Sequence, residues 1–270
     1  MLTVLVQMIA QELQLPIEKI SVTVMNTEAE LWDRGSSAVS VTNVAGHATL
    51  KAVDQARQKL NATACEYLGC PPDEVTLVDG FFRDPDGIAP PMPFADVAAR
   101  ACEGGQPVTG HCRYDSWERN YAASFVAQVA EVEVDPRSGK VTVRRIASAA
   151  DAGIVLNPNG AGGQIEGATI IGLGGATMEE LRIADGRVLN PGLREYKLPT
   201  MGDLPEMTNT FIEQGGGPSP YGAKTVADLG LLVASAAIAN AISDAVGVRF
   251  DELPITAEKV YRALQARGGG

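Results

Sequence analysis

The sequence predicts an α+β fold, with helices packed against antiparallel hairpins and mixed sheets, and two patterns carry that prediction. Several segments place apolar residues at helical spacing, i, i+3, i+4 and i+7. Other segments alternate apolar and polar residues on either side of short turn sequences, as the strands of hairpins do. A mixture of antiparallel hairpins and helices is typical of the α+β class.

In the first half of the chain, apolar spacing and stop signals predict three helices and two strands. The pattern over 2–13 is an amphipathic helix, and the β-branched run 20–25 is a strand. A helix over 45–68 ends at Gly69, because glycine readily adopts the left-handed backbone that stops a helix. The remaining segments are a strand at 74–79, a turn at 84–87 and a short helix at 94–102.

In the second half, alternation over 125–134 and 140–147 around the turn 135–139 predicts a long antiparallel hairpin. A second hairpin surrounds Asp185-Gly186. Helical segments follow the same reasoning and are expected at 164–181, 229–246 and 256–266.

Glycines inside the helix 164–181 call for an explanation, because each costs about 1 kcal/mol relative to alanine. Gly167, Gly172, Gly174 and Gly175 lie within it. These glycines allow either a neighbouring backbone or a ligand to approach the helix closely, and both explanations stay open.

The composition limits the classes to which the protein can belong. The 270 residues suggest one or two domains at about 150 residues each, and we expect two α+β parts, residues 1–120 and 121–270. A 45% apolar content fits a packed core rather than a disordered chain. The net charge of −11 disfavours nucleic acid as a partner, because phosphate binding needs clustered Lys and Arg.

The chain shows neither a targeting segment nor protein-based metal chemistry. It lacks a basic leader and an apolar run of about 18 residues free of charge and glycine. A cytoplasmic protein without a membrane span is therefore expected. The two histidines, His47 and His111, and the four cysteines have no metal-ligand spacing, so no protein-ligated metal is predicted.

Two loops could carry chemistry. The first, 36–46, is rich in small hydroxyl residues, and its backbone N–H groups could hold an anion; the alternative is an ordinary Ser/Thr turn. The second, 215–228, is glycine-rich and places Asp228 just before a helix. It is either a ligand site at the helix N-terminus or a simple N-cap.

Five segments in one order resemble the C-terminal half of the molybdopterin-binding subunit of the xanthine oxidase (molybdenum hydroxylase) family. The resemblance covers about residues 1–265, and the smaller chain of a split molybdenum subunit is the expected identity. The segments are Thr3-x3-Gln7, Ala150-Asp-Ala-Gly153, Gly163-Gln-Ile-Glu-Gly167, Tyr196-Lys-x-Pro-Thr200 and Gly222-Ala-Lys-Thr-Val-Ala-Asp228.

The resemblance implies a molybdenum pyranopterin cofactor, free or as its cytosine dinucleotide. The dithiolene of the pterin holds the metal, which agrees with the lack of His and Cys clusters. Gln164 matches a pterin-contacting glutamine, and Thr3 and Gln7 lie on a helix that faces the cofactor. The loop that approaches the molybdenum contains Ser36, Ser37, Ala38, Val39 and Ser40. Val39 stands where the family more often has serine.

The family reaction hydroxylates a carbon next to nitrogen, or an aldehyde carbon, with water-derived oxygen. A glutamate at the end of the last motif is the base, and Asp228 matches it with one methylene less. Thr225 and Ala227 replace two loop glycines, whereas Lys224 keeps its place. An active site with a closer loop or a weaker base, and a site that has lost activity, both remain open.

The expected partners are a larger molybdopterin-binding chain, a [2Fe-2S] subunit and an FAD subunit, with a small-molecule substrate. The alternative is a non-catalytic structural subunit that completes a partner's molybdenum domain.

Overall fold

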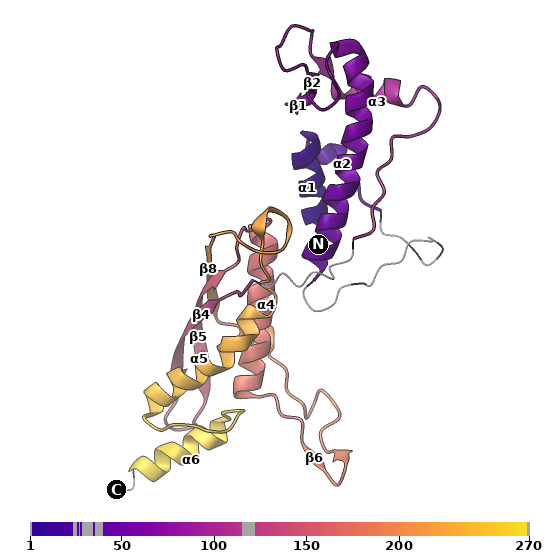
Figure 1. The fold of residues 1–270 in the computed structure, drawn as a ribbon. Helices are drawn as coiled ribbons and strands as arrows, with labels where there is room; N and C mark the ends of the chain where they lie inside the picture. Colours follow the sequence, from indigo (N-terminus) through magenta and orange to yellow (C-terminus); the bar gives the residue numbers. More distant parts are fainter. Residues whose placement is uncertain are drawn as a thin grey trace. The chain divides into compact units, whose positions relative to one another are not determined.

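The computed structural model describes residues 2–23, 26, 28, 35, 40–114 and 122–268. Two compact units make up the chain: Met1–Asn120, called unit 1, and Tyr121–Gly270, called unit 2 (Figure 1).

Unit 1 consists of helices and a small three-stranded antiparallel sheet in the order β1-β2-β3. Helix α1 packs along α2, and α3 packs on α2 beside the sheet (Figure 1). Its elements are α1 (Leu2–Leu13), a 3₁₀ turn η1 (Ile17–Lys19), α2 (Val41–Leu68), β1 (Thr76–Val78), β2 (Phe81–Arg83), β3 (Met92–Pro93) and α3 (Phe94–Ala101).

The core of unit 1 lies where the C-terminal half of α2 meets the sheet and α3. Phe82 and Val97 are fully buried there against Leu60, Ala64 and Leu68 of α2. The side-chain rings of Phe82 and Phe94 stack with centroids 5.8 Å apart. The core therefore ties a long helix to strands too short to be stable alone.

Unit 2 is a three-stranded mixed sheet in the order β4-β5-β8 with helices packed on it. Strands β4 and β5 are antiparallel with a bulge at Glu131/Val132, and β5 and β8 are parallel. The elements are β4 (Val126–Val134), β5 (Val141–Asp151), α4 (Pro158–Thr177), β6 (Ile183–Ala184), β7 (Arg187–Val188), η2 (Met201–Asp203), β8 (Glu206–Ile212), η3 (Pro220–Gly222), α5 (Leu229–Val246) and α6 (Ala257–Gly268).

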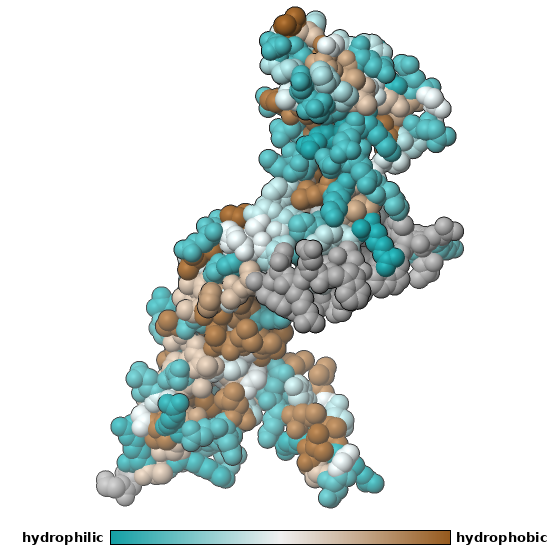
Figure 2. All heavy atoms as spheres, in the orientation of Figure 1, coloured by the Kyte–Doolittle hydropathy of each residue, from teal (hydrophilic) through white to brown (hydrophobic). Residues whose placement is uncertain are grey.

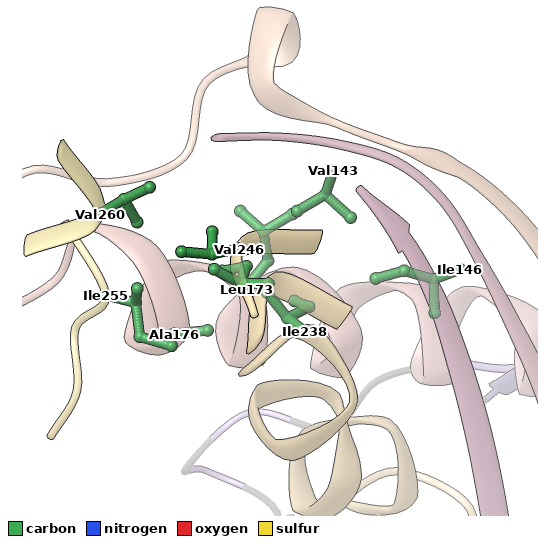
Figure 3. Packing of buried hydrophobic residues seen from close by; sticks show 9 residues of the cluster. Val143, Ile146, Leu173, Ala176, Ile238, Val246, Ile255 and Val260 are labelled. Carbon is green, nitrogen blue, oxygen red and sulfur yellow. The ribbon is translucent and has the colours of Figure 1, made fainter. Parts of the chain in front are cut away.

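The core of unit 2 forms between the sheet, α4 and α5 (Figure 3). Ile146 of β5, Leu173 of α4 and Ile238 of α5 are at most 2% exposed and belong to one apolar cluster. Ile255 and Val260 extend the cluster to the beginning of α6. Alternation along β4 directs every second residue into this layer, as the period of a half-buried strand requires.

Glycine allows α4 and α5 to approach closely. A Cβ on Gly230 of α5 would lie 2.4 Å from the carbonyl oxygen of Ile165, and one on Gly172 would lie 2.6 Å from the Cβ of Ala234. For Gly172 the backbone-approach reading of the helix glycines is therefore correct. A Cβ on Gly174 would meet Glu179 and Pro199, whereas one on Gly167 would meet nothing within 4 Å.

The structure confirms the α+β class, the helices and both hairpins, and corrects four details. Described residues 20–23 form no strand; Ile20 is extended but pairs with no strand among the described residues. Residues 41–46 of the expected hydroxyl-rich loop belong to α2. Helix α4 begins at Pro158, where the Asn157 side chain accepts from the Gly160 N–H at 2.7 Å, and it ends at Thr177. Strands β2, β3 and β8 were not predicted.

Helix α5 is long and apolar enough to cross a membrane by length and composition, which the expectation of no such segment overlooked. In this structure its buried residues, including Ile238 and Ile242, pack against α4 and β4. A buried core helix of a globular protein has the same composition.

We expect Gly230→Ala to destabilise unit 2 by about 1–3 kcal/mol, because its Cβ overpacks the backbone of α4. The matched control is Gly167→Ala, whose Cβ meets open space on α4 and should stabilise the helix by about 1 kcal/mol. Urea unfolding measures both. Equal effects of the two substitutions would contradict the close packing of α4 on α5.

Candidate functional site

The motif segments 150–153 and 222–228 meet at the end of β5. Lys224 and Asp151, whose side chains join them, lie 73 positions apart in the sequence. Gly153 and Ala223 form an antiparallel bridge. The N–H of Lys224 donates to the carbonyl of Ala152 at 2.8 Å. The loop 222–228 is therefore held against the end of a core strand by its backbone.

A partly buried ion pair joins the same two segments through their side chains. Lys224 Nζ donates to Asp151 Oδ2 at 2.8 Å, and the side chains are 12% and 16% exposed. Asp151 Oδ1 also accepts from the N–H of Gly153 at 3.1 Å. The hydrogen bond from Lys224 and then that from Gly153 lower the pKa of Asp151 below its ordinary value of 3.8.

The backbone contact between the segments requires glycine. Gly153 has a φ of +64°, and a Cβ there would lie 2.3 Å from the carbonyl oxygen of Gly222. A Cβ on Gly217 would lie 1.9 Å from the carbonyl oxygen of Ala223. Any side chain at these positions would push the loop away from β5.

Asp228 stands directly before α5, with an exposed side chain. It occupies the N-cap position of α5 but makes no side-chain cap hydrogen bond, so its carboxylate does not cap the helix. No residue that the structure describes forms a hydrogen bond or ion pair with its carboxylate. The next residue, Leu229, is 4% exposed and packs with Ala150 and Ile165. The backbone at Asp228 is thus anchored while its carboxylate faces outward.

Gln164 lies on the exposed side of α4, next to the buried Ile165. Its amide makes no hydrogen bond with the described residues. A Cβ on Gly163 or on Gly167 would meet nothing within 4 Å, so bare backbone flanks the amide. A large flat ligand can reach this surface, and an amide offers both donors and acceptors to a pterin edge.

The other expected cofactor residues lie in unit 1 or outside the described residues. Thr3 is exposed and Gln7 is half-buried, one turn apart on α1. Ser40 precedes α2, and its carbonyl accepts from the Val44 N–H at 2.9 Å. Residues 36–39, which contain Ser36, Ser37, Ala38 and Val39, lie outside the described residues. Gln164, Lys224 and Asp228 all lie in unit 2, where Leu229, the neighbour of Asp228, packs with Ile165, the neighbour of Gln164.

The sequence reasoning missed two polar contacts that position these segments. Asp151 was quoted within a motif but not identified as the partner of Lys224, although opposite charge in two motif segments was a usable signal. The second contact joins Tyr196 Oη to Glu179 Oε2 at 2.9 Å, which raises the pKa of Tyr196 through the hydrogen bond to the carboxylate.

Across residues 2–23, 40–114 and 122–268, no group of three or more His, Cys, Asp or Glu side chains is arranged to hold a metal ion.

A family model and curated relatives match this chain. The family model described as molybdopterin cofactor-binding domain matches residues 1–205. The 6-hydroxypseudooxynicotine dehydrogenase complex subunit gamma of Paenarthrobacter nicotinovorans is 33% identical over 97% of this chain and 34% of that protein. The putative xanthine dehydrogenase molybdenum-binding subunit XdhA of Escherichia coli is 31% identical over 98% of this chain and 36% of that protein.

Solved structures share the fold. Reconstituted CO dehydrogenase from Oligotropha carboxidovorans superposes with a TM-score of 0.85 at 22% identity, over 98% of this chain and 34% of that one. Quinoline 2-oxidoreductase from Pseudomonas putida 86 also gives 0.85, at 23% identity, over 97% and 35%.

The chain spans about a third of the length of the curated relatives that it matches. The family match extends over most of its residues and confirms the resemblance found in the sequence motifs. The chain belongs to the molybdopterin cofactor-binding domain family, within the xanthine oxidase type of molybdenum-dependent oxidoreductases.

Proposed function

We propose that this chain is the cofactor-binding and base-carrying part of a heteromeric molybdenum hydroxylase. The substrate class is an N-heteroaromatic compound or an aldehyde, and the oxygen comes from water. The observation that carries the proposal is the loop 222–228, which the Lys224–Asp151 pair and the backbone hold against β5 while the Asp228 carboxylate stays without a partner among the described residues.

The cofactor in this proposal is molybdenum pyranopterin, free or as its cytosine dinucleotide. Gln164 offers its amide to the pterin edge, and the open backbone at Gly163 and Gly167 leaves room for the ring system. Thr3, Gln7 and residues 36–40 are the further contacts that we assign to the cofactor.

Asp228 is the general base in this proposal. When bound, the molybdenum centre supplies the two-electron oxidation of the substrate carbon. The Asp228 carboxylate accepts the proton that the water-derived nucleophile loses. Asp228 is one methylene shorter than the glutamate of the family motif, and Thr225 and Ala227 stiffen the loop. A fixed loop compensates for the shorter side chain, since reach matters as much as pKa.

Electrons leave through partners in this proposal. A larger molybdopterin-binding chain completes the pocket, and [2Fe-2S] and FAD subunits carry the two electrons to an acceptor. We place the complex in the cytoplasm.

Asp228→Ala in the purified complex should lower turnover by about 100- to 10,000-fold, the usual contribution of a general base. Molybdenum and pterin content should stay at the wild-type level, because the side chain is exposed and makes no hydrogen bond or ion pair with the described residues. Asp228→Glu should keep activity. Unchanged turnover in Asp228→Ala would instead favour a structural subunit that completes a partner's domain.

Asp151→Asn should destabilise the chain more at neutral pH than in acid. The lowered pKa of Asp151 means that its ionised form stabilises the fold above pH 3.8, and that this contribution is lost as the pH falls through the lower folded-state pKa. Urea unfolding at about pH 7 and about pH 3 measures the difference.

The control for this measurement is Asp86→Asn, an exposed position that has no such ion pair. A destabilisation by Asp151→Asn that is the same at both pH values would show that the ion pair with Lys224 does not hold the loop.

Gln164→Ala should reduce the pterin content of the purified complex severalfold without changing the unfolding midpoint of the chain, because the amide is exposed. Asn159→Ala, also exposed on α4, is the control and should leave pterin content unchanged. Full pterin occupancy in Gln164→Ala would remove Gln164 from the cofactor site.

A further inference from the structure

A projecting arm of unit 2 exposes an unusual concentration of large apolar side chains. The arm, residues 181–201, contains the β6–β7 hairpin and extends away from the sheet and α5 (Figure 1). Brown apolar surface gathers on the same hairpin in Figure 2. Its exposed residues are Leu181, Ile183, Val188, Leu189, Leu193, Leu198 and Met201, with exposed fractions from 44% to 86%.

The base of the arm is fixed to the segment that follows α4 by partly buried polar contacts. Asn190 is 2% exposed; its Nδ2 donates to the carbonyl of Glu180 at 2.7 Å, and its Oδ1 accepts from the N–H of Arg182 at 2.9 Å. Tyr196 Oη donates to Glu179 at 2.9 Å. The arm therefore holds a set conformation before anything covers it.

A two-stranded hairpin with apolar residues on its surface does not stabilise itself in water. Contiguous exposed apolar surface of this kind marks a site of association with another polypeptide surface. The preformed base lowers the entropy lost on association, because few backbone dihedrals remain to be ordered.

The length of the relatives suggests an occupant for the arm. They match this chain over 34% and 36% of their own length, so about two thirds of each relative has no counterpart in it. The solved relatives carry the same fold inside chains about three times as long. An apolar arm in this fold therefore has much further polypeptide of the same subunit to pack on.

We propose that the arm 181–201 is the docking surface for the remainder of the molybdenum-binding subunit. This inference rests on the proposed function. A second copy of this chain fits less well, because a twofold contact sets arm against arm. Each arm carries four basic and two acidic residues, so like charge would meet like.

The test compares arm variants with a matched control in the full chain, co-expressed with the remainder of the subunit. Leu193→Asp and Met201→Asp change side chains that are 74% and 86% exposed, and Ile88→Asp changes one that is 84% exposed in unit 1. All three variants should keep the wild-type circular dichroism and unfolding midpoint. A tag on this chain recovers the remainder of the subunit, and the recovered ratio is measured.

We expect each arm variant to weaken the complex by about tenfold or more, as charge placed in a buried apolar contact does, while Ile88→Asp matches wild type. Amide exchange across the arm should slow in the complex. Recovery equal to wild type with both arm variants overturns the docking surface and leaves the proposed function standing.

Two other outcomes also overturn the inference, and each is distinct. Wild-type chain that recovers no remainder at all rejects the proposed heteromer itself. Wild-type chain that dimerises alone, and that Leu193→Asp makes monomeric, assigns the arm to a second copy of this chain.

Discussion

The close approach of α5 to α4 is the contact on which the rest of unit 2 depends. Gly230 lies against the backbone of Ile165, and Gly172 lies against Ala234, so the two helices meet almost without intervening side chains. Leu229 then reaches the cluster with Ala150 and Ile165. Because α5 begins at Leu229, this contact also fixes where the preceding loop must end. Packing thus determines the position of Asp228 before any polar interaction acts.

Polar interactions then orient the loop 222–228 against β5. Unlike a site built from metal-binding side chains, this one consists of a backbone bridge, a single ion pair and open helix surface. The Lys224–Asp151 pair is only partly exposed, at 12% and 16%, so water screens it less than an ion pair on the outer surface. The same loop ends on a carboxylate that faces outward. The glycines serve helix packing at Gly172 and Gly230 and leave open surface at Gly163 and Gly167.

Local sequence patterns predicted the local structure well. The helix 229–246 has the expected bounds, Gly69 ends α2 in the left-handed conformation, and the Asp185-Gly186 hairpin forms as expected. Non-local pairing was harder to predict. Strand β8 lies parallel to β5 after more than 50 intervening residues, and the seven residues of β8 do not by themselves indicate β5 as the pairing strand. Residues 20–23 show the converse, a strand-like pattern without a partner among the described residues. At the candidate site, the motifs predict Asp228 and Lys224, whereas the fold is needed to show that Lys224 pairs with Asp151 rather than with another acidic residue of the motifs.

The central claim is that this chain forms part of a molybdopterin site, and the composition of the native complex tests it most directly. The complex purified through this chain should be analysed for molybdenum by mass spectrometry and for pterin by fluorescence after oxidation. We predict molybdenum and pterin in equimolar amounts with this chain. A stable complex that contains this chain and neither molybdenum nor pterin would contradict the account.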